Sequence, residues 1–249
     1  MHPDEIRDLY DELLAESYER QFLFPPQVEE TSAYELSVIA ERLGDRGRLL
    51  DVACGTGWLL GRFPEHERAG LDLSPSMLAR AHEANPGIEL REGDFREEQP
   101  DWNGRWDVVA CMWFAYCYLD TVREVEELIG RMAGWAAPEG CVLLPVCDES
   151  VLAPEGVQYR RPVDHYGGEL LITGLCWSWR DPANGKLHRD LVAPHVERLL
   201  EVFARHFRQV ELLRYPGTSG RHAILATARR AVGDGAAEVV RPEVEHGRY

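Results

Sequence analysis

Apolar residues follow two patterns along this chain: short continuous runs, and longer stretches with apolar positions three or four residues apart. The first pattern is typical of strands that are buried on both faces, and the second of amphipathic helices. Runs of the strand type occupy 48–53, 69–72, 88–91, 106–112 and 141–147, and helical stretches separate most of them. The alternation predicts an α/β protein with a parallel sheet covered by helices on both faces.

Polar residues mark where several of the helices begin. In residues 4–23 the apolar positions lie three or four residues apart, which predicts a single helix. A second helix is predicted to begin around Ser32, because Glu35 three residues later completes a capping box. Ser74 before a proline is likewise a typical start of a helix. Two helices are therefore expected before the first strand, and one after the second.

The pattern changes after Asp148, where no clear helix is predicted up to residue 193. An antiparallel hairpin is expected there, with strands at 170–179 and 187–192 around a turn at 181–185. The last elements are predicted as a helix at 195–207 and strands at 208–214 and 222–228. Residues 231–249 are polar and aperiodic, and we expect a flexible tail.

Composition, charge and cysteine spacing indicate which partners, compartment and metal sites to expect. The chain has 249 residues and a net charge of −16, with no run of basic residues, so nucleic acid is not expected as a partner. No segment approaches about 18 uninterrupted apolar residues, and the N-terminus lacks the apolar stretch of a signal peptide. The six cysteines include no Cys-x-x-Cys pair. These features predict a cytoplasmic protein with free thiols, no membrane contact and no metal site.

A glycine turn between the first strand and the next helix carries the strongest chemical signal. The segment 51–57 reads Asp-Val-Ala-Cys-Gly-Thr-Gly, and the second strand ends in Asp72. Glycines at such a turn let the backbone approach a bound nucleotide-like ligand. An acidic side chain at the end of the next strand can accept hydrogen bonds from both ribose hydroxyls. Together they predict a nucleoside-containing cofactor at the sheet edge.

These residues resemble the class I S-adenosylmethionine-dependent methyltransferases. The segment 51–57 is similar to that family's first motif, Asp72 to its ribose-binding acid, and Gly93-Asp94-Phe95 to the element beside adenine. The resemblance covers about 45–147. It implies a Rossmann-like, seven-strand, mostly parallel sheet with the hairpin region inserted. The turn at 219–221 is similar to that of methyltransferases that dimethylate amino sugars.

The resemblance also implies a division of the chain. Residues 1–230 would form one domain. Its expected parts are lid helices at 1–44, a cofactor-binding core at 45–147, a substrate-side insert at 148–193 and a closing helix and strands at 194–230. The insert is the expected surface for a homodimer.

S-adenosylmethionine is the cofactor that the resemblance implies. The backbone at Ala53, Gly55 and Gly57 would approach its methionine and ribose portions, with Asp51 beneath the loop near the amino group. Asp72 would bind the ribose. The remaining implied contacts are Leu73, Met77, Asp94 and Phe95 around adenine, Met112 and Trp113 where donor meets acceptor, and Tyr18 or Tyr10 closing over the donor.

The glycine turn alone also fits the dinucleotide site of an NAD(P)-dependent oxidoreductase. Asp51 argues against that interpretation, because a carboxylate there would face a pyrophosphate unfavourably, and the Gly93-Asp94-Phe95 element has no dinucleotide counterpart. A protein that binds the nucleoside donor without catalysis remains an alternative. In that case core side chains would fill the acceptor pocket.

Methyl transfer from a sulfonium is an in-line displacement that depends mainly on positioning. A base is needed when the acceptor arrives protonated, and His165 and His188 in the insert and Tyr116 after the fourth strand are the candidates. The expected acceptor is an amine on a small natural-product or sugar-like intermediate. A hydroxyl acceptor is the alternative.

Overall fold

The computed structural model describes the chain except for residues 25, 148–151, 153–157, 163–168, 217–221 and 243–249. Within the described residues the main sheet has eight strands in the order β12-β10-β11-β5-β4-β1-β2-β3. Its strands are β1 (Arg48–Val52), β2 (Glu67–Asp72), β3 (Glu89–Glu92), β4 (Trp106–Ala110), β5 (Ala136–Val146), β10 (Phe207–Arg214), β11 (His222–Arg229) and β12 (Glu238–Val240). Strands β1 to β5 are parallel, and β11 is antiparallel to both of its neighbours.

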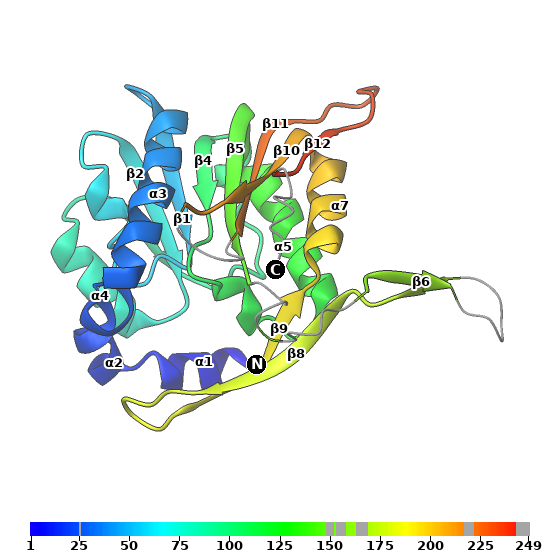
Figure 1. Ribbon diagram of the computed structural model, residues 1–249. Coiled ribbons are helices and arrows are strands. Elements are labelled where there is room, and N and C mark those ends of the chain that lie inside the picture. The colour runs from blue at the N-terminus through cyan, green and yellow to red at the C-terminus, as the bar shows by residue number, and fades with distance from the viewer. Residues whose placement is uncertain (25, 148–151, 153–157, 163–168, 217–221, 243–249) are drawn as a thin grey trace.

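Helices cover both faces of this sheet, as the alternation of patterns predicts (Figure 1). One face packs against α5 (Val122–Trp135) and α7 (Val196–His206), and the other against α3 (Pro26–Leu43) and α4 (Pro75–Ala84). In β1, Leu50 packs in the apolar core on the face covered by α5 and α7. Leu49 packs in the core on the face covered by α3 and α4. This alternation follows from the two-residue period of a strand. Short helices lie at η2 (Leu60–Arg62), η3 (Pro100–Trp102) and η4 (Ala115–Tyr118).

Two expectations about the sheet need correction. It has eight strands rather than seven, because β12 pairs in parallel with β10 at the edge of the sheet. That strand lies within the segment 231–249, which was predicted to be a flexible tail. Strand β5 also begins at Ala136, earlier than the expected 141, with an irregular register beside Trp106.

The N-terminal region differs from the two predicted helices. Residues 4–23 divide into α1 (Pro3–Leu9), α2 (Glu12–Tyr18) and a π-helix, η1 (Glu19–Leu23). The next helix, α3, begins at Pro26 and not near Ser32. Ser32 and Glu35 are buried, and Oε1 of Glu35 accepts a hydrogen bond of 2.6 Å from the hydroxyl of Tyr215. Glu35 of the capping-box pattern therefore makes a tertiary contact inside a longer helix.

The predicted hairpin is confirmed as β8 (Gly174–Arg180) paired with β9 (Leu187–Pro194). A second small ribbon joins β6 (Arg160–Pro162) to β7 (Glu169–Leu171). The β8–β9 hairpin runs beneath the sheet, with its turn beside α1 and α2 (Figure 1). Nζ of Lys186, the chain's only lysine, donates to the Asp11 carboxylate at 2.7 Å and to two carbonyl groups at the end of α1. The insert and the N-terminal helices thus close the same end of the sheet.

Candidate functional site

The glycine loop after β1 has the left-handed backbone that its sequence predicts. Gly55 has φ +53° and a Cβ there would point into open space, which leaves the backbone accessible from the cavity beside it. Gly57 has φ +74° and lies against α4, where a Cβ would approach the side chain of Asn85 to 2.7 Å. Gly57 is not among the residues that line the cavity, so its glycine is required for packing.

Asp72 joins the end of β2 to this loop. One carboxylate oxygen accepts a hydrogen bond of 2.7 Å from the N–H of Gly55, and the other accepts one of 2.8 Å from the N–H of Ser74. Burial raises the pKa of Asp72, while these N–H groups oppose the rise by stabilising the charged form. The carboxylate therefore fixes the loop and also faces the cavity.

Asp51, at the end of β1, is fully buried, and neither of its carboxylate oxygens has a hydrogen-bond partner within the described structure. Burial, and then the nearby charge of Asp72, raise its pKa well above the usual value. A buried carboxylate without a partner costs free energy that a bound cation can offset. The site therefore fits a ligand that carries a positive amino group near the loop, as S-adenosylmethionine does.

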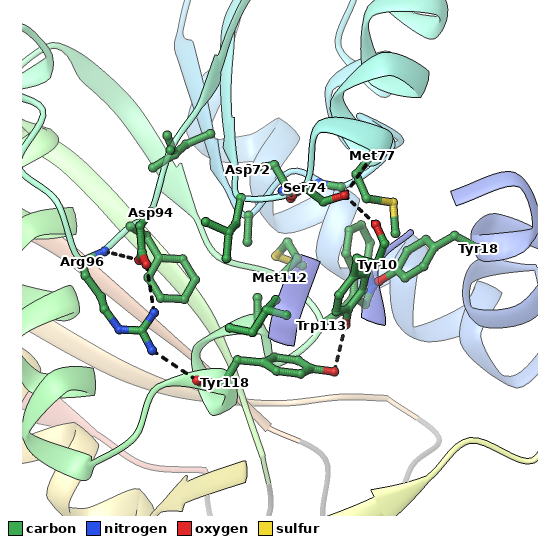
Figure 2. Close-up of a pocket in the computed structure, with 18 residues that line it drawn as sticks. Tyr10, Tyr18, Asp72, Ser74, Met77, Asp94, Arg96, Met112, Trp113 and Tyr118 are labelled. Carbon is green, nitrogen blue, oxygen red and sulfur yellow. Dashed lines mark hydrogen bonds and ion pairs between the residues drawn. The ribbon is translucent and has the colours of Figure 1, made fainter. Parts of the chain in front are cut away.

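A cavity lies over the carboxyl ends of β1, β2 and β4 (Figure 2). Ten of the twelve residues predicted to bind the cofactor line it: Tyr18, Ala53, Gly55, Asp72, Leu73, Met77, Asp94, Phe95, Met112 and Trp113. Asp51 and Gly57 lie outside this lining. Parallel strands place ligands at this edge, because the loops that follow them converge there.

Asp94 has a partner that the sequence interpretation missed. Its carboxylate accepts hydrogen bonds from the backbone N–H of Arg96 at 2.8 Å and from that residue's guanidinium at 3.0 Å. Arg96 also donates to the carbonyl oxygen of Tyr118 and lines the same cavity (Figure 2). The Asp94 carboxylate is thus oriented by an arginine at the adenine end of the expected site.

A second cavity of about 290 Å³ adjoins the first. The two share four lining residues, Tyr10, Tyr18, Trp113 and Tyr118. Most of the second lining is aromatic, and it comes from the N-terminal helices, the segment after β4 and the β8–β9 hairpin. The rest of this lining is Leu14, Phe22, Val28, Phe114, Cys117, Trp177, Trp179, His188 and Leu191.

His188 is the one candidate base that reaches a cavity in the described part of the chain. Its side chain is 2% exposed, and Nδ1 lies 2.6 Å from the hydroxyl of Tyr118, which accepts a hydrogen bond of 2.9 Å from the hydroxyl of Tyr10. Nε2 has no partner among the described residues. Burial lowers the pKa of His188, so its imidazole is neutral at neutral pH.

The other two candidate bases are Tyr116 and His165. Tyr116 is fully buried, lines neither cavity and accepts a hydrogen bond of 2.7 Å from the backbone N–H of Cys147. His165 lies outside the described residues. Sequence reasoning gave no role to Phe22, whose place in the second cavity depends on the fold of the N-terminal helices.

Two negative observations concern only the described residues. No group of three or more His, Cys, Asp or Glu side chains in that part of the chain could hold a metal ion. None of its helices is long and apolar enough to cross a membrane.

Comparison with known proteins supports the fold. Residues 49–140 match the family described as "Methyltransferase domain". An N,N-dimethyltransferase of dTDP-4-amino-2,3,4,6-tetradeoxy-D-glucose from Saccharopolyspora spinosa is 35% identical over 111 residues, 44% of each chain. One acting on dTDP-3-amino-3,4,6-trideoxy-alpha-D-glucopyranose from Streptomyces venezuelae is 32% identical over 109 residues, 43% of this chain and 45% of that one. The matches span less than half the length of these curated relatives.

Solved structures extend the likeness over most of the chain. Streptomyces venezuelae DesVI has a TM-score of 0.62 and 23% identity, covering 86% of this chain and 98% of that one. CalS10, an amino pentose methyltransferase from Micromonospora echinaspora bound to S-adenosylmethionine, has a TM-score of 0.56 and 25% identity, covering 80% and 90%. Residues 49–140 are therefore similar to a methyltransferase domain, and the fold built around them is the one seen in these solved methyltransferases.

Proposed function

We propose that this protein transfers a methyl group from S-adenosylmethionine to an amine of a small, sugar-like metabolite. The observation that carries the proposal is the buried Asp51 carboxylate without a partner, beneath a glycine loop that Asp72 holds beside an open cavity. A cationic cofactor with a ribose would hydrogen-bond to Asp72 and would bring positive charge near the buried Asp51. A pyrophosphate-containing dinucleotide would instead bring negative charge towards Asp51.

The residues that would hold the cofactor follow from their places in the first cavity. Asp72 accepts hydrogen bonds from the ribose, and Ala53 and Gly55 present backbone to the methionine portion. Asp51 balances the amino group from beneath the loop. Asp94 and the apolar side chains of Leu73, Met77 and Phe95 surround adenine. Tyr18 and Trp113 line both cavities, and Met112 lines the first. The bound cofactor supplies an activated methyl group on a positively charged sulfur.

The acceptor would enter the second cavity. This space is open and lined by aromatic side chains beside Trp113, so it favours an enzyme over a protein that only binds the nucleoside. The two curated relatives compared above are named for N,N-dimethylation of amino sugars, which supports an amine as the acceptor. A hydroxyl acceptor is the alternative outcome of the assay below.

His188 is the residue that we assign to proton transfer. An amine in its ammonium form has no lone pair for attack on the methyl group. A neutral imidazole with a free Nε2 can take one proton from it. In the tautomer that this role requires, Nδ1–H donates to the hydroxyl oxygen of Tyr118, Nε2 keeps its lone pair, and the hydrogen bond fixes the orientation of the ring. Positioning the nitrogen in line with the methyl group supplies most of the remaining acceleration.

Two measurements test the proposal. Isothermal titration calorimetry with S-adenosylmethionine and with S-adenosylhomocysteine should give saturable binding to the full chain. Mass spectrometry should then detect methylated product with dTDP-linked amino sugars and none with the corresponding hydroxyl sugars. An absence of binding heat for both nucleosides contradicts the proposal. Methylation of hydroxyl sugars alone would show that the acceptor atom is oxygen and not nitrogen.

A further inference from the structure

Five aromatic side chains of the second cavity form a closed circuit. The ring centroids of Tyr10 and Tyr18 are 6.2 Å apart, and those of Tyr18 and Phe22 are 5.1 Å apart. The circuit continues from Phe22 to Trp179 at 6.1 Å and from Trp179 to His188 at 4.8 Å, and it returns to Tyr10 at 6.3 Å. All five residues line the cavity. We call these five residues the aromatic cage.

The size of the cage suits a small cation. A flat five-membered circuit with sides of this length has its centre about 5 Å from each corner, within the roughly 6 Å over which a cation is attracted to a ring. Such rings bind substituted ammonium groups well, because those groups are less hydrated than ammonium itself and also gain apolar contact. The cage therefore favours a nitrogen that carries alkyl groups.

The charges around the cage have the sign that a cation requires. No aspartate, glutamate, lysine or arginine of the described chain lines this cavity, so neither an ion pair nor a repelling charge occupies it. The carboxylate of Asp181 is fully buried and close enough to affect the pKa of both His188 and Tyr118. Asp72 acts in the same way on Tyr10 and Tyr18.

Lys186 is the cation that acts on His188, and its ammonium is paired outside the cage. Burial is the main cause that lowers the pKa of His188, and the ammonium of Lys186 adds to it. That ammonium is paired with the carboxylate of Asp11, and it also donates to the carbonyl oxygens of Asp8 and Leu9. Its hydrogen bonds are therefore directed to the N-terminal helices.

We propose that the aromatic cage binds the acceptor nitrogen as an alkyl-substituted ammonium and so selects a substituted amine as the methyl acceptor. This inference rests on the proposed function. The ammonium gives one proton to Nε2 of His188, in the tautomer whose Nδ1–H donates to Tyr118, and the freed lone pair forms the N–C bond. The S–C bond breaks with its electron pair left on sulfur as a thioether. The product is again an ammonium, now with one more methyl group, and His188 releases its proton to solvent.

A pair of probes that differ only in charge tests the cage without knowledge of the acceptor. The full chain is saturated with S-adenosylhomocysteine, and the binding of choline chloride is compared with that of 3,3-dimethylbutan-1-ol, its neutral carbon analogue. Both are measured by calorimetry at equal ionic strength. We expect choline to bind saturably and about tenfold more tightly than the alcohol, because only the cation gains from the ring faces. Equal affinity for the two probes overturns the proposal.

Two substitutions test whether choline binds at the aromatic cage. Phe22→Leu and Trp179→Leu keep apolar volume but remove a ring face, and each should weaken choline binding about threefold or more while leaving the alcohol unaffected. Phe24→Leu is the matched control, because Phe24 is close in sequence but 48% exposed and outside the cavity lining. Choline binding that is unchanged in both cage variants contradicts the proposal.

These measurements distinguish a failure of the proposed function from a failure of the cage proposal. S-adenosylhomocysteine that produces no binding heat contradicts the proposed function. The choline comparison in nucleoside-free protein then still tests the cage. The probe comparison on the unaltered chain needs no variant to fold.

Discussion

The hydroxyl of Tyr118 lies 2.6 Å from Nδ1 of His188, so a residue that follows β4 orients the imidazole of a residue on the inserted hairpin. This contact joins residues 70 positions apart and lies where the two cavities share their walls. It connects the segment after β4, which lines both cavities, to the hairpin, which lines the second.

The first prediction concerns His188 as a base. His188→Gln keeps a polar side chain of similar reach but cannot accept a proton. With an amine substrate we expect kcat/KM to fall about 10²- to 10⁴-fold at neutral pH. The loss should shrink as the pH rises towards the pKa of the amine, because the substrate then ionises without help.

His206→Gln is the matched control for this experiment. Burial lowers the pKa of His206 as it does that of His188, but His206 lines neither cavity. A pH–rate profile of His188→Gln that parallels the parent profile, with only KM changed, would show that His188 positions the substrate without taking its proton.

A second prediction concerns Tyr116. Tyr116→Phe removes the oxygen that accepts a hydrogen bond from the backbone N–H of Cys147. We expect the free energy of unfolding to fall by about 0.5–1.5 kcal/mol, with kcat little changed. Urea unfolding and steady-state kinetics measure the two effects. A fall in kcat of two orders of magnitude in a stably folded variant would instead place Tyr116 in the chemistry.

Asp72 should contribute strongly to cofactor affinity. Asp72→Ala removes the carboxylate expected to bind the ribose and also the acceptor for the N–H of Gly55. Loss of hydrogen bonds to a charged group predicts a Kd for S-adenosylhomocysteine that is about tenfold higher or more. Calorimetry measures it, with Asp107→Ala as the control, because Asp107 pairs with Arg48 at the other end of the strands. Equal affinity in the parent and Asp72→Ala would remove Asp72 from the cofactor site.

Asp51 should make the nucleoside-free protein less stable as the pH rises. Its pKa in the folded state is raised above the unfolded value by burial and by Asp72. Between those two values the folded state therefore binds more protons than the unfolded state, and the free energy of unfolding falls with increasing pH. Asp51→Asn removes this dependence, so the variant should melt above the parent at pH 8 while binding the cofactor more weakly.

The opposite sign at Asp107 provides the control for the pH effect. Burial raises the pKa of Asp107, but its hydrogen bonds with Arg48 outweigh burial and lower it overall. Asp107→Asn should therefore lose stability at neutral pH, and the difference should vanish as the pH falls through the lowered pKa. Thermal melts between pH 3 and pH 8 distinguish the two trends. Identical pH dependence in Asp51→Asn and the parent would contradict the assignment of Asp51.

The last prediction concerns the contact between the hairpin and the N-terminal helices. Lys186→Met removes the hydrogen bonds to Asp11 and to the end of α1. We expect faster amide hydrogen exchange in residues 3–18, because local opening of these helices then costs less free energy. Arg208→Met, which breaks a pair with Glu139 on the far side of the sheet, should leave that exchange unchanged. Unchanged exchange in Lys186→Met would show that the contact does not hold the helices.

Some structure could be predicted because it depends on neighbours in the sequence. The loop at 51–57 and the helix start at Ser74 use backbone geometry that a few adjacent residues determine, and both are found as expected. The side chain of Ser74 accepts the N–H of Met77 at 3.2 Å. The same local reasoning was wrong near Ser32, where a buried contact with distant Tyr215 explains the presence of Glu35.

The sequence by itself determined the parallel core and the end of the sheet at which a cofactor would bind, because strand period, glycine φ and capping are local properties. Only the tertiary structure decided the second cavity and the alignment of Tyr10, Tyr118 and His188. These groups come from segments far apart along the chain, and their contacts form only after the hairpin folds against the N-terminal helices. No spacing in the sequence records the distance between two such segments.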